Sequence, residues 1–315
     1  MGEILSGKEI SVIVCVYDMA RWRQIQACLA SLREQTRRPA KVVVVVDGCP
    51  PLAQALRAVR QDEVIVELPE NRGLSVARNA GIEQVQTPWV AFLDDDAVAE
   101  PTWLERLDQA RRATGAVGVG GWVEPMYDGP APTWFPPHLL WTVGCSHQGL
   151  PTTRSVVRNV FGGCALMSTH ALRSLGGYDP AFGRRGDSAE GGEEADLCLR
   201  INQIDPTAKF LLEPTARIRH HVPPSRARIG YVLRRCYIEG RSKRALSRRL
   251  GMGSLSSETN FVKAVGPDIV RLIAKGRLHQ ALVLLAGVLA AGVGYLTTRS
   301  RPAADATPCV PRAAA

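Results

Sequence analysis

The sequence predicts an α/β protein built on a doubly wound, mostly parallel β-sheet. Short runs of apolar and β-branched residues alternate with segments whose apolar residues recur at helical spacing, as in βαβ units with right-handed crossovers. Three of the apolar runs end in or next to aspartate, so acidic side chains are expected to gather along one rim of the sheet. With 315 residues, 45% of them hydrophobic, the chain can form one large domain and an appendage.

The predicted elements follow in order along the N-terminal half. Residues 10–18 (ISVIVCVYD) form a buried strand, and apolar residues from Trp22 to Leu32 then mark one face of a helix that ends near Pro39. The later elements are a strand over 41–48 (KVVVVVDG), a short strand over 63–68 (EVIVEL), a loop that becomes a helix over 69–85, and a strand over 89–93.

Three consecutive carboxylates follow the strand of residues 89–93. They would repel one another unless a positive group lay among them. Asp94 and Asp96 are two residues apart, so a locally extended chain directs both side chains the same way. Two converging carboxylates suit a hard divalent cation. The alternative is a solvated acidic turn in which Asp96 caps the next helix.

Asp47, at the end of the second strand, also has two interpretations. It opens a turn with Gly48, or it binds a ribose hydroxyl or a base N–H of a nucleotide. The sequence contains neither the glycine-rich dinucleotide fingerprint after the first strand nor the G-x-x-x-x-G-K-[ST] phosphate loop. We therefore expect the rim to bind a nucleotide through carboxylates and a metal.

Six segments stand in the order and spacing of a known family: residues 12–18 (VIVCVYD), 45–48 (VVDG), 71–82 (NRGLSVARNAGI), 89–96 (WVAFLDDD), 161–183 (FGGCALMSTHALRSLGGYDPAFG) and 191–200 (GGEEADLCLR). Over residues 10–225 the chain resembles the family 2 glycosyltransferases. The resemblance implies the nucleotide-sugar (A-type, or GT-A) fold, with a Rossmann-like nucleotide-binding half. Two positions depart from the pattern, because the family usually has Pro where Cys15 stands and Asp where Glu194 stands.

The resemblance implies transfer of a sugar, commonly with inversion, from a nucleoside-diphosphate sugar to a hydroxyl of a glycan, glycolipid or lipid-linked precursor. Asp94-x-Asp96 resembles the D-x-D motif that holds Mn²⁺ or Mg²⁺, and His220 matches a histidine that completes the metal site. His220 belongs to a predicted edge strand over 209–221 (KFLLEPTARIRHH). For Arg78 the alternative is a surface helix residue paired with an acid. The nucleotide-sugar contacts implied are Val16, Asp47, Arg78, Asp94 and Asp95.

An inverting transferase needs one general base for the acceptor hydroxyl. Glu193, Glu194 and Asp196 crowd the start of a predicted helix, where acids also complement the helix dipole. The resemblance places the base at Glu194, and Glu193 is the alternative. Residues 138–151 and 161–167 are expected to frame the acceptor side, and the candidates for stacking on sugar rings are Trp122, Trp134 and Trp141.

After Pro224 the composition changes. Residues 226–249 contain nine Arg or Lys residues and one acid, Glu239. The net charge of this segment, 9 − 1 = +8, is nearly the whole formal net charge of +9. Apolar residues interleave at helical spacing, so we predict a basic amphipathic helix or helix pair. Nucleic-acid binding, a solvated basic face, and attraction to an anionic membrane or lipid diphosphate are the three interpretations. The last agrees best with the apolar segment that follows, and we expect no nucleic-acid partner.

Residues 281–296 (ALVLLAGVLAAGVGYL) form an apolar helix. At about 1.5 Å per residue it spans roughly 24 Å, short of the ~30 Å hydrocarbon core of a bilayer. It is a marginal membrane helix, an in-plane anchor, or a buried helix. The predicted units are a catalytic domain (1–225), a basic extension (226–275), an apolar helix (276–298) and a disordered tail (299–315).

The predicted location is the cytoplasm, at the inner face of the cell membrane. The first nine residues are polar and predict no secretory signal, and the eight scattered cysteines suit a reducing compartment. Two other functional classes compete with the transferase. One is a non-catalytic nucleotide-sugar binding protein, and the other is a nucleic-acid-binding protein that uses the basic helices.

Overall fold

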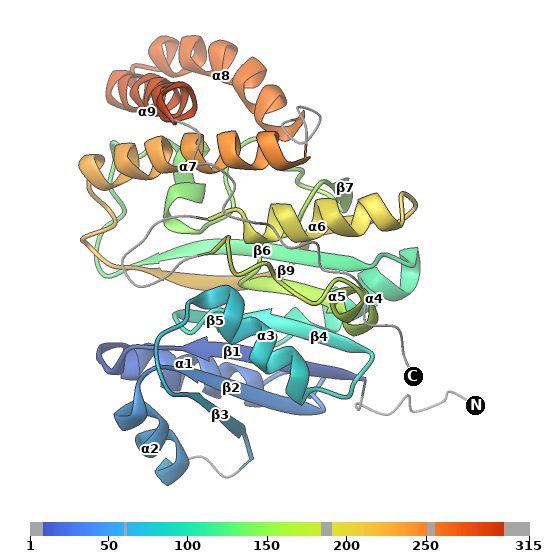
Figure 1. The fold of residues 1–315 in the computed structure, drawn as a ribbon. Coiled ribbons are helices and arrows are strands. Elements are labelled where there is room, and N and C mark those ends of the chain that lie inside the picture. Colours follow the sequence, from blue (N-terminus) through green and yellow to red (C-terminus); the bar gives the residue numbers. More distant parts are fainter. Residues whose placement is uncertain (1–8, 60–61, 184–190, 251–255, 299–315) are drawn as a thin grey trace.

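The computed structural model describes residues 9–59, 62–183, 191–250 and 256–298 (Figure 1). In this part of the chain one sheet has the strand order β3-β2-β1-β4-β8-β6-β9-β5, with β7 beside β9. The predicted disordered tail lies outside the described residues. The strands are β1 (Ile10–Val16), β2 (Lys41–Asp47), β3 (Val64–Leu68), β4 (Trp89–Leu93), β5 (Ala97–Ala99), β6 (Gly118–Tyr127), β7 (Ser155–Val157), β8 (Cys164–Ser168) and β9 (Phe210–Val222).

Helices cover both faces of the sheet because successive residues of the central strands point to opposite sides. Val12 and Val14 of β1 pack in one apolar core with α1, α2 and α4, whereas Ile13 packs in a second core with α3, α5 and α6. The helices of this domain are α1 (Trp22–Arg33), α2 (Pro50–Val59), α3 (Leu74–Gln84), α4 (Trp103–Thr114), α5 (Thr169–Ser174) and α6 (Glu193–Ile204), with 3₁₀ helices η1 (Met19–Arg21) and η2 (Pro137–Val143).

The α/β prediction is confirmed, and the parallel strands occupy the nucleotide-binding half. β3, β2, β1 and β4 are parallel to one another, so their carboxyl ends share one rim. The other half is mixed, because β8 runs antiparallel between β4 and β6 while β6 and β9 are parallel.

The first helix ends earlier than predicted, at Arg33 and not near Pro39. Beyond it the chain bonds to the loop before α4. The Gln35 amide donates to the carbonyl of Glu100 at 2.8 Å, and the Thr36 N–H donates to the carbonyl of Pro101 at 2.8 Å. These distant contacts draw the chain out of the helix, and no local periodicity signals them.

The prediction that residues 209–221 form an edge strand is wrong. β9 pairs with β6 on one side and with both β5 and β7 on the other. The two covering strands are only three residues long each, too short to stand out as apolar runs. In the β5–β9 pair Ala97 lies opposite His220, which brings this histidine to the acidic rim.

Helices α7 (Ile229–Leu250), α8 (Ser256–Ala274) and α9 (Leu278–Thr297) form a layer beside the half of the sheet that contains β6 and β9 (Figure 1). Small residues let α9 approach α7 closely. A Cβ atom at Gly294 would overlap the backbone carbonyl of Tyr237, and one at Gly240 would overlap that of Ala291. The close contact made by the small residues of α9 is therefore within the chain.

We expect Gly294→Ala to destabilise the protein by about 1–3 kcal/mol, the usual effect of overpacking, because the added methyl separates α7 from α9. Gly292 is the matched control, since it lies on the same helix with open space around its Cβ position. Gly292→Ala should leave stability unchanged or raise it by about 0.5–1 kcal/mol through helix propensity. Thermal melting curves of both variants test the contact, and equal melting temperatures would contradict it.

Candidate active site

Two aspartates of the rim order loops beside it: Asp47 holds the loop between β3 and α3, and Asp18 holds the turn after β1. Asp47, at the end of β2, accepts hydrogen bonds from the backbone N–H groups of Arg72 (2.8 Å) and Gly73 (2.9 Å). Gly73 has φ of 91° and opens α3, so this carboxylate fixes the start of the helix that carries Arg78. Asp18, after β1, caps η1 by accepting from the N–H of Ala20 at 2.9 Å.

Asp94, Asp96 and His220 form a cluster suited to a divalent cation. One ligating atom from each lies within 4.8 Å of the other two. Two carboxylate oxygens and one imidazole nitrogen fit Mn²⁺ well and Mg²⁺ acceptably. The turn after β4 places the two aspartates, and the β5–β9 pairing places the histidine. The structure thus brings together the three side chains that the sequence assigned to the metal.

Ion pairs hold these side chains in place. His220 Nε2 lies 3.1 Å from Asp96 Oδ1. Burial alone would lower the pKa of His220, but the Asp96 carboxylate outweighs it and raises the pKa to about 10. Burial would likewise raise the pKa of Asp96, whereas His220 and Arg21 hold it well below its ordinary value.

Arg21 is a positive group beside Asp95 and Asp96 that sequence reasoning missed. Its Nη1 lies 2.8 Å from Asp95 Oδ1 and 3.2 Å from Asp96 Oδ2. Burial and the adjacent Asp96 raise the pKa of Asp95, and Arg21 opposes them. The available signal was position, because Arg21 follows β1 and so lies at the same rim as the acids that end β4.

Arg78 is buried and is not the surface residue of the alternative interpretation. Its Nη1 lies 3.2 Å from Glu194 Oε1 and 3.6 Å from Glu193 Oε1, and its Nη2 lies 3.8 Å from Asp94 Oδ1. The guanidinium also lies over the Tyr178 ring, 5.1 Å from its centroid. One side chain therefore joins the cluster after β4 to the acids that begin α6.

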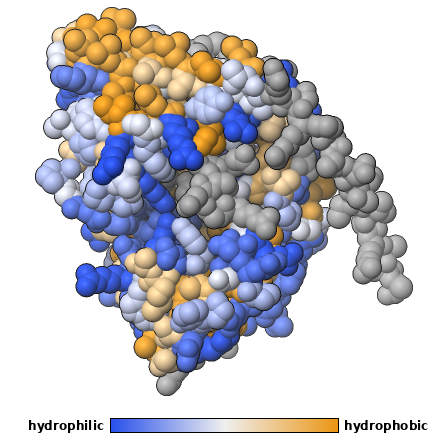
Figure 2. All heavy atoms as spheres, turned by 60° about the vertical axis from the view of Figure 1, so that its left-hand side comes forward, coloured by the Kyte–Doolittle hydropathy of each residue, from blue (hydrophilic) through white to orange (hydrophobic). Residues whose placement is uncertain are grey.

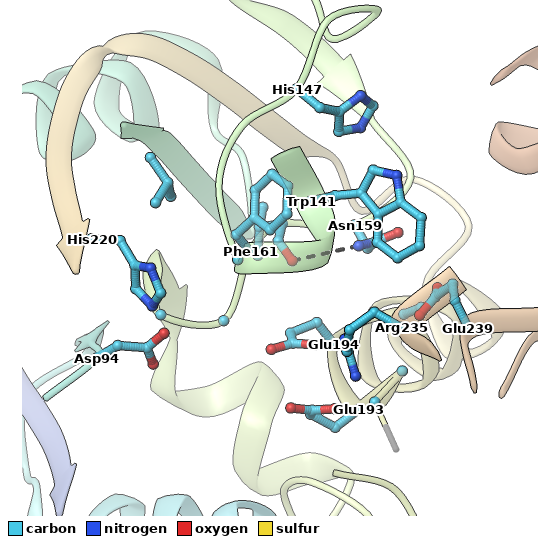
Figure 3. Close-up of a pocket in the computed structure, with 18 of the residues that line it drawn as sticks. Asp94, Trp141, His147, Asn159, Phe161, Glu193, Glu194, His220, Arg235 and Glu239 are labelled. Carbon is cyan, nitrogen blue, oxygen red and sulfur yellow. Dashed lines mark hydrogen bonds between the residues drawn. The ribbon is translucent and has the colours of Figure 1, made fainter. Parts of the chain in front are cut away.

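The two candidate bases differ in exposure. Gly192, with φ of 106°, turns the chain into α6, and Glu193 and Glu194 follow it directly. The Glu193 side chain is 5% exposed and that of Glu194 is 23% exposed. Asp196 is fully buried, and its carboxylate accepts from Arg200 Nε at 2.7 Å. Figure 3 shows the carboxylates of both glutamates directed toward the side where Asp94 and His220 lie.

Gly162 and Gly163 pass so close to the site that no side chain fits. A Cβ at Gly163 would overlap the Asp94 carboxylate, and one at Gly162 would overlap the carboxylate of Glu194 and crowd the Arg78 guanidinium. The Gly163 carbonyl also accepts the N–H of Asp94 at 3.2 Å. Residues 161–163, expected to frame the acceptor side, thus also form a wall of the site that packs directly against the carboxylates of Asp94 and Glu194.

Gly163→Ala should displace the Asp94 carboxylate and lower turnover by about 10²-fold, the scale of a 1 Å misplacement of a catalytic group. Gly129→Ala is the control, since the Cβ position of Gly129 is open. Initial rates measured against metal concentration should show a raised metal requirement for the first variant only. Wild-type metal dependence in Gly163→Ala would show that the wall does not position Asp94.

The predicted site residues all line one cavity of about 880 Å³. Trp141 and His147, from the segment expected to frame the acceptor, line it as well (Figure 3). Trp122 and Trp134 are not among its lining residues, and Trp134 stacks on Phe135 with ring centroids 5.2 Å apart. The cavity continues beyond the rim to residues of α7, α8 and α9. The predicted residues that meet there are Val16, Asp47, Arg78, Asp94, Asp95, Asp96, Glu193, Glu194 and His220.

The fold is that of the GT-A glycosyltransferases. The crystal structure of GalNAc-T7 with UDP, GalNAc and Mn²⁺ matches with a TM-score of 0.54 and 16% sequence identity. The match covers 84% of this chain and 55% of that one, so the chain spans about half of that protein. At this identity the likeness concerns the fold.

The chain belongs to glycosyl transferase family 2, whose pattern matches residues 11–176. It is similar to the glucosyl-dolichyl phosphate glucuronosyltransferase of Haloferax volcanii, with 33% identity over 76% of this chain and 77% of that protein. It is also similar to the succinoglycan biosynthesis protein ExoM of Rhizobium meliloti, with 28% identity over 74% and 73% of the two chains. The protein is therefore a nucleotide-sugar glycosyltransferase, and the predicted family is confirmed.

Proposed function

We propose that the protein is a metal-dependent, inverting transferase that moves a sugar from a nucleoside-diphosphate sugar to a hydroxyl acceptor. One observation carries this proposal. The metal-ligand cluster and the candidate base line the same cavity, and Arg78 contacts both, with 3.8 Å to Asp94 and 3.2 Å to Glu194. A donor diphosphate and an acceptor hydroxyl bound there would meet between the two.

On the donor side, Asp94, Asp96 and His220 would hold Mn²⁺ or Mg²⁺. The bound cation supplies Lewis-acid stabilisation of the charge that develops on the leaving diphosphate. Arg21 keeps Asp95 and Asp96 in place by its two ion pairs. The nucleotide-sugar would be bound along the rim by Val16, Asp47, Arg78, Asp94 and Asp95, all of which line the cavity.

On the acceptor side, Glu194 would accept the proton of the attacking hydroxyl. Its side chain is the more exposed of the two candidates, and its Oε1 lies 3.2 Å from Arg78 Nη1, which holds the carboxylate in the cavity. Attack on the face of the anomeric carbon opposite the diphosphate gives inversion. Glu193 is buried beside the same guanidinium at 3.6 Å and is the second candidate.

The acceptor is proposed to be a glycan, a glycolipid or a lipid-linked precursor. A relative that is 33% identical is described as acting on a glucosyl-dolichyl phosphate, which supports the lipid-linked class. We propose residues 1–225 as the catalytic domain, 226–275 as a basic extension and 276–298 as an apolar helix for attachment. The protein would then lie in the cytoplasm at the inner face of the cell membrane.

A screen of nucleotide sugars tests the proposal. Each is incubated with the protein and Mn²⁺, Mg²⁺ or EDTA, and both donor hydrolysis and the thermal melting temperature are measured. A cognate donor should raise the melting temperature. It should be hydrolysed slowly when Mn²⁺ or Mg²⁺ is present and not at all with EDTA. Stabilisation without any turnover, in the presence of candidate acceptors, would instead favour the non-catalytic binding protein. The anomeric configuration of the product, read by NMR, decides whether transfer inverts.

Nucleic-acid binding receives little support from the basic helix. Arg235 of α7 is buried, Lys243 pairs with Glu239 at 2.9 Å, and Arg244 lies over the Tyr295 ring at 5.0 Å. Several of the cations that suggested this function are therefore engaged in packing α7 within the chain. Salt-dependent binding to random duplex DNA would reverse this judgement.

A further inference from the structure

Helix α9 exposes a stripe of large apolar side chains. Leu282, Leu285, Leu289, Val293 and Leu296 are between 45% and 82% exposed and recur every three or four residues, so they share one face. The neighbouring end of α8 and the first residue of α9 add three more exposed apolar residues. We call all eight the apolar face, and Figure 2 shows hydrophobic side chains gathered at this end of the molecule. The three added residues are Val270, Ile273 and Leu278.

The opposite side of α9 is committed to the protein. Ala281, Leu284 and Gly287 are buried, and a Cβ at Gly287 would press on Leu139 of η2. Gly294 rests against the backbone of α7, a helix rich in arginine. Within the described residues α9 is the helix long and apolar enough to cross a bilayer. Crossing would require it to leave α7 and would uncover the polar and charged side chains of that helix.

Cations flank the apolar face at both ends. Lys275 and Arg277 are exposed at the α8–α9 turn, next to Leu278. At the other end Arg248 of α7 is exposed and donates to the carbonyl of Thr298 at 3.4 Å. Asp268 is an acid close to the apolar face, and its carboxylate is engaged within the protein. It accepts a hydrogen bond from Arg271 at 2.7 Å and contacts His138 at 2.9 Å. This distribution complements an anionic lipid surface. Two copies of the face would instead bring like charges together.

We propose that the apolar face docks on an anionic bilayer with α9 parallel to the membrane plane. The apolar face would be buried at the boundary between headgroups and acyl chains, and the flanking cations would contact lipid phosphates. The α9 residues Gly287, Val288 and Ala291 line the catalytic cavity from the inner side of the same helix. Docking would thus set this cavity directly beneath the lipid surface. The inference gives a structural basis to the proposed membrane location and does not depend on the transfer reaction.

Vesicle sedimentation tests the docking surface. The full-length protein should bind vesicles of phosphatidylcholine and phosphatidylglycerol, more weakly in high salt and more weakly still to phosphatidylcholine alone. Leu285→Glu/Leu289→Glu should lower the partition coefficient by more than about tenfold, because it places two charges on the exposed stripe that would enter the bilayer. The control is Val59→Glu/Ile204→Glu, which changes residues 54% and 68% exposed elsewhere and should bind as the wild type does.

Donor hydrolysis without lipid should be equal in the two double variants, which shows that both are folded. Failure of the wild type to bind anionic vesicles, or equal binding by both variants, overturns the proposal. Light scattering without lipid adds a further criterion. A dimer that Leu285→Glu/Leu289→Glu dissociates, together with no vesicle binding, would assign the face to a second copy of the chain.

A depth measurement separates in-plane docking from crossing. A fluorescent amino acid is placed in turn at Leu282, Leu289 and Leu296, which lie about 21 Å apart from first to last along the helix. Quenching is compared between lipids brominated near the headgroup and lipids brominated near the chain end. An in-plane helix gives equal, shallow quenching at all three positions. Deep quenching confined to Leu289 would show that α9 crosses the bilayer and would overturn the in-plane arrangement.

Discussion

Asp96→Asn should lower metal-dependent transfer by about 10³-fold, because a bound metal contributes several kcal/mol and each ~1.4 kcal/mol is a factor of ten. The substitution removes one ligand charge but keeps the size of the side chain and one acceptor oxygen, which can serve either His220 (3.1 Å from Oδ1) or Arg21 (3.2 Å from Oδ2), and Arg21 also retains Asp95 at 2.8 Å. We therefore expect the fold to survive. Activity titrated with Mn²⁺, and melting curves with and without Mn²⁺, should show loss of both responses.

Asp108→Asn is the matched control for this experiment. Asp108 is also a buried carboxylate with arginine partners, including Arg112 Nε at 2.8 Å, but it lies in α4 away from the cavity lining. Its substitution should lower the melting temperature without changing the response to Mn²⁺. Wild-type turnover by Asp96→Asn in the presence of EDTA would show that the metal assignment is wrong.

Glu194→Gln should lower transfer by about 10²–10⁴-fold, the usual contribution of a positioned general base. The amide keeps the length and shape of the side chain but accepts no proton from the acceptor hydroxyl. Donor binding should change little, because Arg78 retains Glu193 at 3.6 Å and Asp94 at 3.8 Å as partners. Single-turnover rates with acceptor, and donor affinity measured without acceptor, separate the two effects.

Glu193→Gln is the companion variant, since it changes the adjacent carboxylate beside the same guanidinium. We expect it to reduce stability more than turnover, because the Glu193 side chain is buried. The reverse result, with a large loss in Glu193→Gln and none in Glu194→Gln, would move the base one residue back along α6.

Local patterns were sufficient for the parts of the fold that are local. The apolar runs of β1, β2 and β4 and the aspartates that follow them were readable because each strand is a continuous buried segment. The two aspartates of the metal cluster were found from their spacing after the strand, His220 was added through the family resemblance, and the structure brings the three together. Arg21, which pairs with both Asp95 and Asp96, was not found, since it lies far from them in the sequence and meets them only across the rim.

The remaining misses have the same physical origin. β9 was taken for an edge strand because β5 and β7 are three residues each, too short to stand out as apolar runs. The tight approach of Gly162 and Gly163 to the acids is equally invisible, because a glycine pair in a sequence does not say what its missing side chains would meet. Both features arise from tertiary pairing between distant segments.

The short β5–β9 pairing also has a consequence for folding. Asp94 and Asp96 lie directly before β5, whereas His220 belongs to β9, the last strand of the described residues. A half-folded chain without β9 in place therefore has two of the three side chains and no complete cluster. A ligand that needs all three side chains binds only the completely folded sheet. At a free concentration of a hundred times its dissociation constant, such a ligand adds about 2.7 kcal/mol to the free energy of unfolding. Through the three residues of β5, the resistance of the whole domain to denaturant therefore depends on whether this one site is occupied.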